Sequence, residues 1–233
     1  VSEVRSSSDR KQDLPFVRTA ILPKFSKRVL DSLSLEKRYY KALAAPYYSF
    51  VSPSFDIKPD SSLSLLLKVN KANAFRVDFG GIISSRAINT GFLSLAYRRA
   101  GLVGQRLEVS SYFGKFYGSG KVNYELVLPG SVPVSLSAYL VLNRWDYFKS
   151  FATFFEDVKP SFLIQEERYT GFQIRIPTGT HSVITGNTRF FWLDDSYYQT
   201  DYFTKEDTAD YTSFIGESIR VAYTKNTLNR KQF

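Results

Sequence analysis

The sequence predicts a mainly β protein, in which an antiparallel β-barrel that spans a membrane follows a small α+β module. Three observations predict the barrel. From Ala74 onward, apolar and polar residues alternate repeatedly, which is the period of a strand whose two faces differ. Several of these stretches exceed the roughly 9–11 residues that cross a bilayer at a tilt. Short Gly/Pro turns also alternate with longer polar loops, as they do in such barrels.

The composition resembles that of a soluble globular chain, with 43% hydrophobic residues and a mean hydropathy of −0.22. These averages do not exclude a membrane barrel, because only alternate residues of each strand meet lipid. No apolar run approaches the roughly 18–20 residues of a membrane helix, so strands must make any crossing. The net charge of +9 is spread along the chain, and we expect no nucleic-acid partner.

Residues 1–73 predict a linker and part of a small module that lies outside the membrane. The helix is predicted by an N-terminal cap at Ser34, by apolar residues at four-residue spacing and by Pro46 at its end. The predicted elements are a linker (Val1–Asp13), a short strand (Phe16–Leu22), the helix (Ser34–Ala45) and two strands (Tyr48–Ile57 and Leu63–Asn70).

Residues 74–233 predict eight strands of the barrel. They are Phe75–Ser85, Gly91–Arg99, Arg106–Phe116, Gly120–Leu128, Val132–Trp145, Ser161–Ile176, Ser182–Tyr198 and Ser213–Tyr223. The segment Gly118–Lys121 has the look of a phosphate-binding loop but lacks the Ser or Thr that follows the lysine there, so a hairpin turn is predicted instead. From the lengths of the connections, the first strand runs outward and residues 1–73 lie in the periplasm.

No set of residues in the sequence predicts catalysis. Cysteine is absent, and His181 is the single histidine, so neither a metal site nor another cofactor is expected. Glu166 and Glu167 are adjacent on a strand and point to opposite faces, which excludes a paired-carboxylate site. We therefore predict that this chain is not an enzyme.

Two other sets of residues are candidates for structural roles in the barrel. Glu125 and Arg175 are expected to line its polar interior. Gly80 and Gly81 are paired glycines inside a strand, which often mark a bulge or a bend.

A resemblance to a known family rests on five groups of residues. The stretch FRVDFGGIISSRAINTGF follows LEKRYYKALAAPYYSFVSPSFDIKPDSSLSLLLKV, and the later pieces are FFEDVKPSFLIQEERYTGFQIRIPTG, SYYQTDYFTKEDTADYTSF and YTKNTLNRKQF. Over roughly residues 34–233 this pattern resembles the junction of a POTRA module and the barrel in the BamA-type outer-membrane superfamily. It is most similar to the version in Bacteroidetes proteins that carry an upstream patatin-like phospholipase domain.

The resemblance implies a location in the bacterial outer membrane and a barrel of sixteen strands, of which this chain holds the first half. It also implies that Gly80 and Gly81 lie beside the barrel seam. The implied partners are outer-membrane lipid, a patatin-like domain upstream in cis, and a lipid or polypeptide substrate. The barrel would anchor that hydrolase in the membrane and would also move a substrate of the hydrolase across it. The nucleophile motif of the hydrolase is absent from this chain.

Two alternatives remain open from the sequence. In the first, the barrel assembles or translocates outer-membrane proteins and carries no hydrolase. In the second, the chain is a complete eight-stranded barrel or a soluble β-rich binding module. A soluble module would be extracted without detergent, which separates it from both membrane hypotheses.

Overall fold

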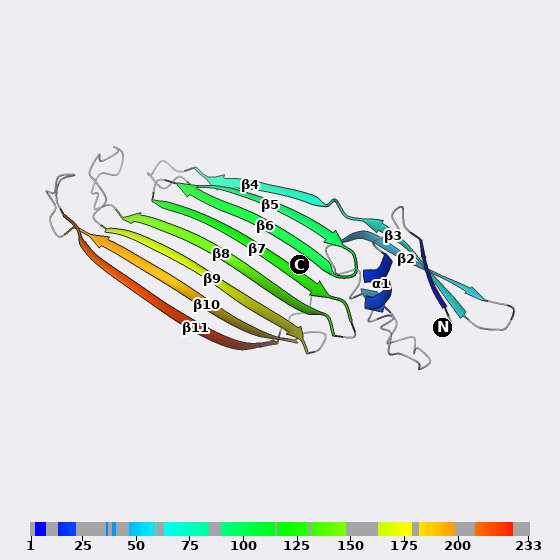
Figure 1. Cartoon of the computed structure of the whole chain (residues 1–233). Helices are drawn as coiled ribbons and strands as arrows, with labels where there is room; N and C mark the ends of the chain where they lie inside the picture. The colour runs from blue at the N-terminus through cyan, green and yellow to red at the C-terminus, as the bar shows by residue number, and fades with distance from the viewer. Residues whose placement is uncertain are drawn as a thin grey trace.

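The structure is a computed structural model and consists of two β-sheets joined end to end (Figure 1). It describes residues 3–7, 14–21, 36, 39–40, 47–57, 59, 63–83, 90–114, 116–130, 132–147, 163–178, 182–198 and 208–225. Within these ranges, no helix is long and apolar enough to cross a membrane.

The N-terminal module is a three-stranded sheet with one helix. Its elements are β1 (Glu3–Ser7), α1 (Leu14–Ile21), β2 (Tyr48–Ile57) and β3 (Leu63–Lys71). The strand order is β1-β3-β2, so β3 is central, with β1 parallel and β2 antiparallel to it. The predictions of β2 and β3 are confirmed to within one residue.

The prediction of a strand at Phe16–Leu22 is wrong, because residues 14–21 form α1. Phe16, Val17 and Ile21 are at most 3% exposed, whereas Arg18 is exposed. Apolar residues one and four positions apart share one face of a helix, and here that face packs into the core of the module. Pro15 is compatible with this helix because the first turn has no intrahelical partner for a proline nitrogen.

The prediction of a linker at Val1–Asp13 is also wrong for residues 3–7, which form β1. The ladder bonds of a strand join backbone groups, so a polar segment can add itself to an open sheet edge. Of the predicted helix Ser34–Ala45, the described residues Glu36, Tyr39 and Tyr40 are helical, and the rest lies outside the described residues.

The core of the module lies between α1 and one face of its sheet. Along β3, Leu65, Leu67 and Val69 are at most 2% exposed, while Leu66 between them is 39% exposed. Val51 of β2 is fully buried beside them. This alternation orients the three-stranded sheet with one face on the core and one face outward.

Eight further strands form the second sheet, in the unbroken order β4 to β11, with every neighbouring pair antiparallel. Their bounds are β4 (Phe75–Ile82), β5 (Thr90–Ala100), β6 (Gly104–Gly114), β7 (Tyr117–Leu128), β8 (Val134–Tyr147), β9 (Leu163–Pro177), β10 (Ser182–Tyr197) and β11 (Asp210–Lys225). All eight strands were predicted, with ends that differ by a few residues. The prediction of a turn at Gly118–Lys121 is wrong, because these residues belong to β7.

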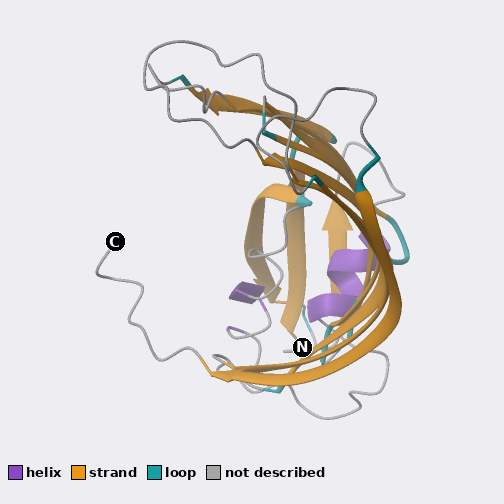
Figure 2. Ribbon diagram, turned by 90° about the vertical axis from the view of Figure 1, so that its left-hand side faces the viewer, coloured by secondary structure: helices purple, strands orange, loops and turns teal. Residues whose placement is uncertain are grey.

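The eight-stranded sheet is strongly curved but is not closed (Figure 2). Among the described residues, β4 pairs only with β5, and β11 pairs only with β10. The two edges therefore remain open, which argues against a complete eight-stranded barrel. An open edge has unpaired backbone groups that need another strand or water.

Candidate functional site

The eight-stranded sheet has two chemically different faces, and one of them is apolar in every strand. Members of this apolar face are Val77, Leu95, Val109, Val122, Leu140, Phe172, Ile184 and Ile219, one from each strand in order. The cross-strand register places such residues side by side, as with Val77 opposite Leu95 and Val122 opposite Leu140. The face is thus predominantly apolar rather than a set of scattered apolar residues. It is interrupted on β11 by Glu217, which accepts a hydrogen bond of 3.4 Å from the Thr188 hydroxyl.

The apolar face is the convex one, and the polar face is concave. On the polar face, Ser94, Ala96 and Val141 are at most 5% exposed. On the apolar face, the neighbouring Leu95 and Leu140 are both 46% exposed. Side chains crowd together on the inside of a curved sheet and spread apart on its outside. The lower exposure of the polar face therefore shows that it is the inside of the curved sheet seen in Figure 2.

The concave face holds a polar hollow of about 510 Å³ that extends from β6 to β11. Glu125 and Arg175, the two residues predicted to line the interior of a barrel, both line this hollow. Tyr139 is at its centre, where the Asn187 amide donates a hydrogen bond to the Tyr139 hydroxyl at 2.8 Å. The structure thus brings the two predicted residues to one surface, while their place in a closed lumen stays a prediction.

Gly80 and Gly81 lie in β4, the strand at the open edge of the sheet. They pair in continuous register with Phe92 and Gly91 of β5. A Cβ on Gly81 would lie 2.7 Å from the carbonyl oxygen of Thr90, whereas a Cβ on Gly80 would meet nothing within 4 Å. Gly81 therefore permits a close backbone approach, and the role of the pair beside a seam stays a prediction.

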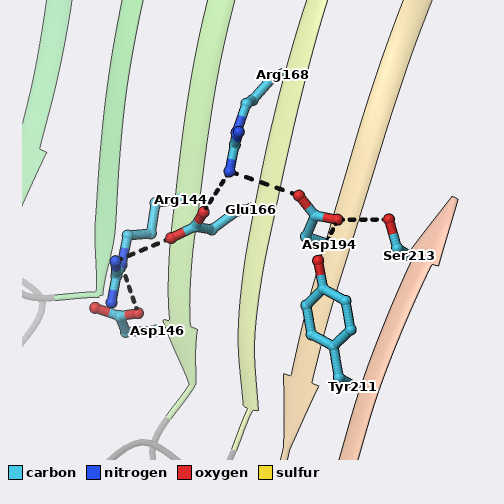
Figure 3. A network of polar contacts seen from close by, with 7 residues as sticks. All are labelled: Arg144, Asp146, Glu166, Arg168, Asp194, Tyr211 and Ser213. Atoms are coloured by element: carbon cyan, nitrogen blue, oxygen red, sulfur yellow. Dashed lines mark hydrogen bonds and ion pairs between the residues drawn. The ribbon is translucent and has the colours of Figure 1, made fainter. Parts of the chain in front are cut away.

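A chain of ion pairs crosses the convex face at the end of the sheet away from the module (Figure 3). Arg144 contacts Asp146 at 3.2 Å and Glu166 at 3.0 Å. Arg168 contacts the second oxygen of Glu166, also at 3.0 Å. The two arginine side chains are 53% and 54% exposed, so each pair contributes little to stability in water.

The same network continues onto β10 and β11 through Asp194 (Figure 3). Its carboxylate lies 3.5 Å from Arg168 and accepts hydrogen bonds of 2.7 Å from the hydroxyls of Tyr211 and Ser213. These polar residues follow directly on the apolar part of the convex face, for example after Leu142 in β8 and before Thr170 in β9. The network therefore marks where the apolar surface ends.

Adjacent carboxylates of β9 point to opposite faces, as predicted. Glu166 belongs to the convex network, whereas Glu167 accepts a hydrogen bond of 2.8 Å from the Asn143 amide on the concave face. Among the described residues, no group of three or more His, Asp or Glu side chains is placed to hold a metal ion.

The module contacts the sheet through Tyr47, a contact that the sequence analysis missed. Tyr47 is 5% exposed and packs edge-on against Phe16 of α1, with ring centroids 5.2 Å apart. The same core includes Ala100 at the end of β5. Desolvation, reinforced by the negative charge of Glu125, raises the pKa of Tyr47 to about 12, so its hydroxyl is neutral at physiological pH.

Gly104, at the start of β6, leaves the space that the Tyr47 ring occupies. A Cβ built on Gly104 would lie 2.6 Å from the ring and hydroxyl atoms of Tyr47, which is closer than real Cβ contacts. We expect Gly104→Ala to displace the ring and to lower the free energy of unfolding by about 1–3 kcal/mol. Hydrogen exchange of the module and of the β5–β6 hairpin would measure the loss.

Gly101→Ala is the matched control, because a Cβ on Gly101 would meet nothing within 4 Å. Equal losses in both variants would show that Tyr47 is not what makes alanine unfavourable at position 104.

Comparisons with known proteins place the fold but not the family. No family profile matches the sequence, and no curated protein matches it. Among solved structures, the chain is similar to BamA from Haemophilus ducreyi lacking POTRA domains 1-3, with a TM-score of 0.71 and 11% identity over 98% of this chain. It is also similar to CdiB from Acinetobacter baumannii, with a TM-score of 0.57 and 10% identity over 98% of this chain.

These matches cover 44% of the BamA chain and 43% of the CdiB chain, so the present chain spans less than half the length of either. The mainly antiparallel sheet of eight strands thus has the fold of part of a BamA-type barrel.

Proposed function

We propose that this chain forms part of the wall of an outer-membrane β-barrel of the assembly or translocation type, with residues 1–73 as a periplasmic POTRA-like module. The observation that carries the proposal is the division of the eight-stranded sheet into an apolar convex face and a polar concave face. A sheet that is apolar on its outside and polar on its inside suits lipid around it and water within it. A soluble sandwich would bury its apolar face against a second sheet.

The strand lengths support a membrane position. β8 to β11 contain 14 to 16 residues each, which is longer than the roughly 9–11 residues needed to cross the hydrocarbon core. The surplus lies at the end that carries the Arg144–Asp194 network, where headgroups and water can solvate the charges. We place this end outside the cell and the module in the periplasm.

The narrower part of the proposal concerns partners and cargo. A patatin-like hydrolase upstream in cis, anchored by the barrel, rests on the sequence resemblance of residues 34–233 alone. The substrate would then be lipid, whereas an assembly barrel without a hydrolase would handle polypeptide. The fold is common to both readings, so lipid hydrolysis by the intact protein is the assay that separates them.

Single cysteines test the position of the two faces, since these 233 residues contain none; any cysteine elsewhere in the intact protein is first replaced by serine. In membranes of cells that make the intact protein, Leu140→Cys should be protected from a water-soluble maleimide. Ser137→Cys, on the concave face of the same strand, should react. Detergent-dependent extraction and a heat-modifiable gel band are expected in parallel.

Equal labelling of both cysteines, or extraction without detergent, would contradict the membrane proposal. A double-cysteine variant, Val77→Cys in β4 with Ile219→Cys in β11, tests whether the two edge strands meet. Efficient disulfide formation between them would show that these eight strands close on themselves, and the analogy to a larger barrel would fail.

A further inference from the structure

The concave hollow has a strongly unbalanced charge. Its lining includes five cationic side chains and one carboxylate: Arg106, Lys121, Arg175, Arg189, Arg220 and Glu125. A concave surface lined by one sign of charge focuses the electrostatic field and raises the local concentration of counter-ions. A generally polar barrel interior requires no such excess of one sign.

Most of these cations have no carboxylate partner. Among the described residues, the structure gives no ion pair to Lys121, Arg175 or Arg220. Arg106 pairs with Glu108, yet its Nε is buried and has no hydrogen-bond partner within the described part of the chain. Unpaired guanidinium donors are suited to the oxygens of phosphate and carboxylate groups.

Arg189 is oriented by aromatic rings rather than by an acid. Its guanidinium carbon lies 5.1 Å from the ring centroid of Tyr169 and 5.6 Å from that of Phe191. Such contacts hold a guanidinium in place without neutralising its charge. The cation is therefore presented in the hollow with its charge available.

Two further carboxylates of the concave face lie at the edge of the hollow: Glu108, which pairs with Arg106, and Glu167, two positions before the lining residue Tyr169. In β9, Glu167 precedes Arg175 by eight positions (175 − 167 = 8), or about 26 Å at the rise of a strand. In β10, Asp195 follows Arg189 by six positions (195 − 189 = 6), or about 20 Å. Arg175 is therefore distant from Glu167, and Arg189 is distant from Asp195, so the excess positive charge of the hollow is concentrated at Arg175, Arg189 and Arg220.

We propose that this hollow is a binding site for a small anion that carries phosphate or carboxylate groups. Its volume of about 510 Å³ suits one small solute or one head group rather than a folded partner. Arg175, Arg189 and Arg220 would supply the donors. The inference rests on the proposed function only in taking the concave face as the inside of the barrel.

A fluorescent trisulfonated pyrene is a suitable probe, added to the intact protein in a non-ionic detergent and followed by anisotropy. It should bind, and its affinity should fall as salt is raised. Competition by inorganic pyrophosphate and by citrate distinguishes phosphate from carboxylate as the preferred group. The double variant Arg175→Gln/Arg220→Gln should weaken binding at least about tenfold, because charge-assisted hydrogen bonds are lost.

Arg144→Gln is the matched control, because it removes one arginine from the convex face and should change the affinity less than about twofold. Arg175→Lys keeps the charge but loses the planar guanidinium donors, so its affinity should lie between those of the wild type and Arg175→Gln. The heat-modifiable band of every variant reports that it is folded. Unchanged binding in the double variant, or an equal loss in Arg144→Gln, would overturn the proposal. If the protein binds the anion but Leu140→Cys and Ser137→Cys label equally, only the membrane position is refuted. If Leu140→Cys is protected and Ser137→Cys reacts, but the anion does not bind, only the anion site is refuted.

Discussion

Replacing Leu140 with arginine should lower the stability of the membrane-inserted protein by about 2–4 kcal/mol, the cost of this residue on the lipid face of a barrel near the midplane. Leu140 lies in β8 on the convex face and is 46% exposed. Its cross-strand neighbours on that face are Val122 and Thr170, and neither carries a charge that could pair with an arginine. The guanidinium would then sit in hydrocarbon or distort the bilayer around it.

Reversible unfolding of the protein from lipid vesicles by denaturant would measure this loss. Ser137→Arg provides the control, because Ser137 lies on the concave face of the same strand, directly opposite Glu125. We expect that variant to cost much less than Leu140→Arg, since the new cation meets water and the Glu125 carboxylate, although other cations line the same hollow. A cost at position 137 as large as that at position 140 would mean that the two faces do not meet different solvents.

Leu67→Ala should destabilise the N-terminal module by about 2–5 kcal/mol, the usual cost of truncating a fully buried leucine. Leu67 is in β3, the central strand of the three-stranded sheet, and is 0% exposed. Its removal leaves a cavity between β3 and α1 that the neighbouring Val51 and Ile21 fill only by moving. The effect is expected in the module because the core of the module includes little of the eight-stranded sheet.

Hydrogen exchange resolved along the chain would locate the change. Amides of α1, β2 and β3 should lose protection, while those of β7 to β10 should keep it. The control is Leu66→Ala, one residue earlier on the outward face, where the side chain is 39% exposed. A loss at Leu66→Ala that matches the loss at Leu67→Ala would refute the assignment of the two faces of β3.

The period of the sequence was sufficient to predict the eight strands and their two faces. In β8, the residues Val134, Leu136 and Leu140 alternate with polar ones. Alternation over this length indicates a β-strand with one apolar and one polar face. The polar interior expected of a barrel led to the prediction that Glu125 and Arg175 line it. Both residues do line the concave hollow, although they are 50 positions apart in the chain (175 − 125 = 50).

The module was harder to predict because its elements are short. Phe16–Leu22 is an apolar run of strand length, and periodicity alone does not separate such a run from one face of a buried helix. Residues 3–7 carry no apolar pattern, and they form a strand only because β3 presents an open edge to them. Both errors arise from tertiary context that local sequence does not contain.

Contacts between distant residues were also beyond the sequence. The ion pair between Arg144 and Glu166 depends on the β8–β9 register, which places these two residues directly opposite each other. The close contact between the Tyr47 ring and Gly104 depends on how the N-terminal module packs against the β5–β6 hairpin. The one available signal was the change from apolar to charged residues after Leu142, which indicates where the apolar surface ends.

The uninterrupted order of β4 to β11 has a consequence for how the sheet can form. Each strand finds its partner in the strand that directly precedes it in the chain, so every pairing in the sheet is local. The entropy lost on loop closure grows with loop length, and topologies rich in local pairings fold quickly. The sheet can therefore grow by successive hairpins in the order in which the polypeptide is delivered, and at each stage the most recently added strand exposes the edge on which the next strand pairs.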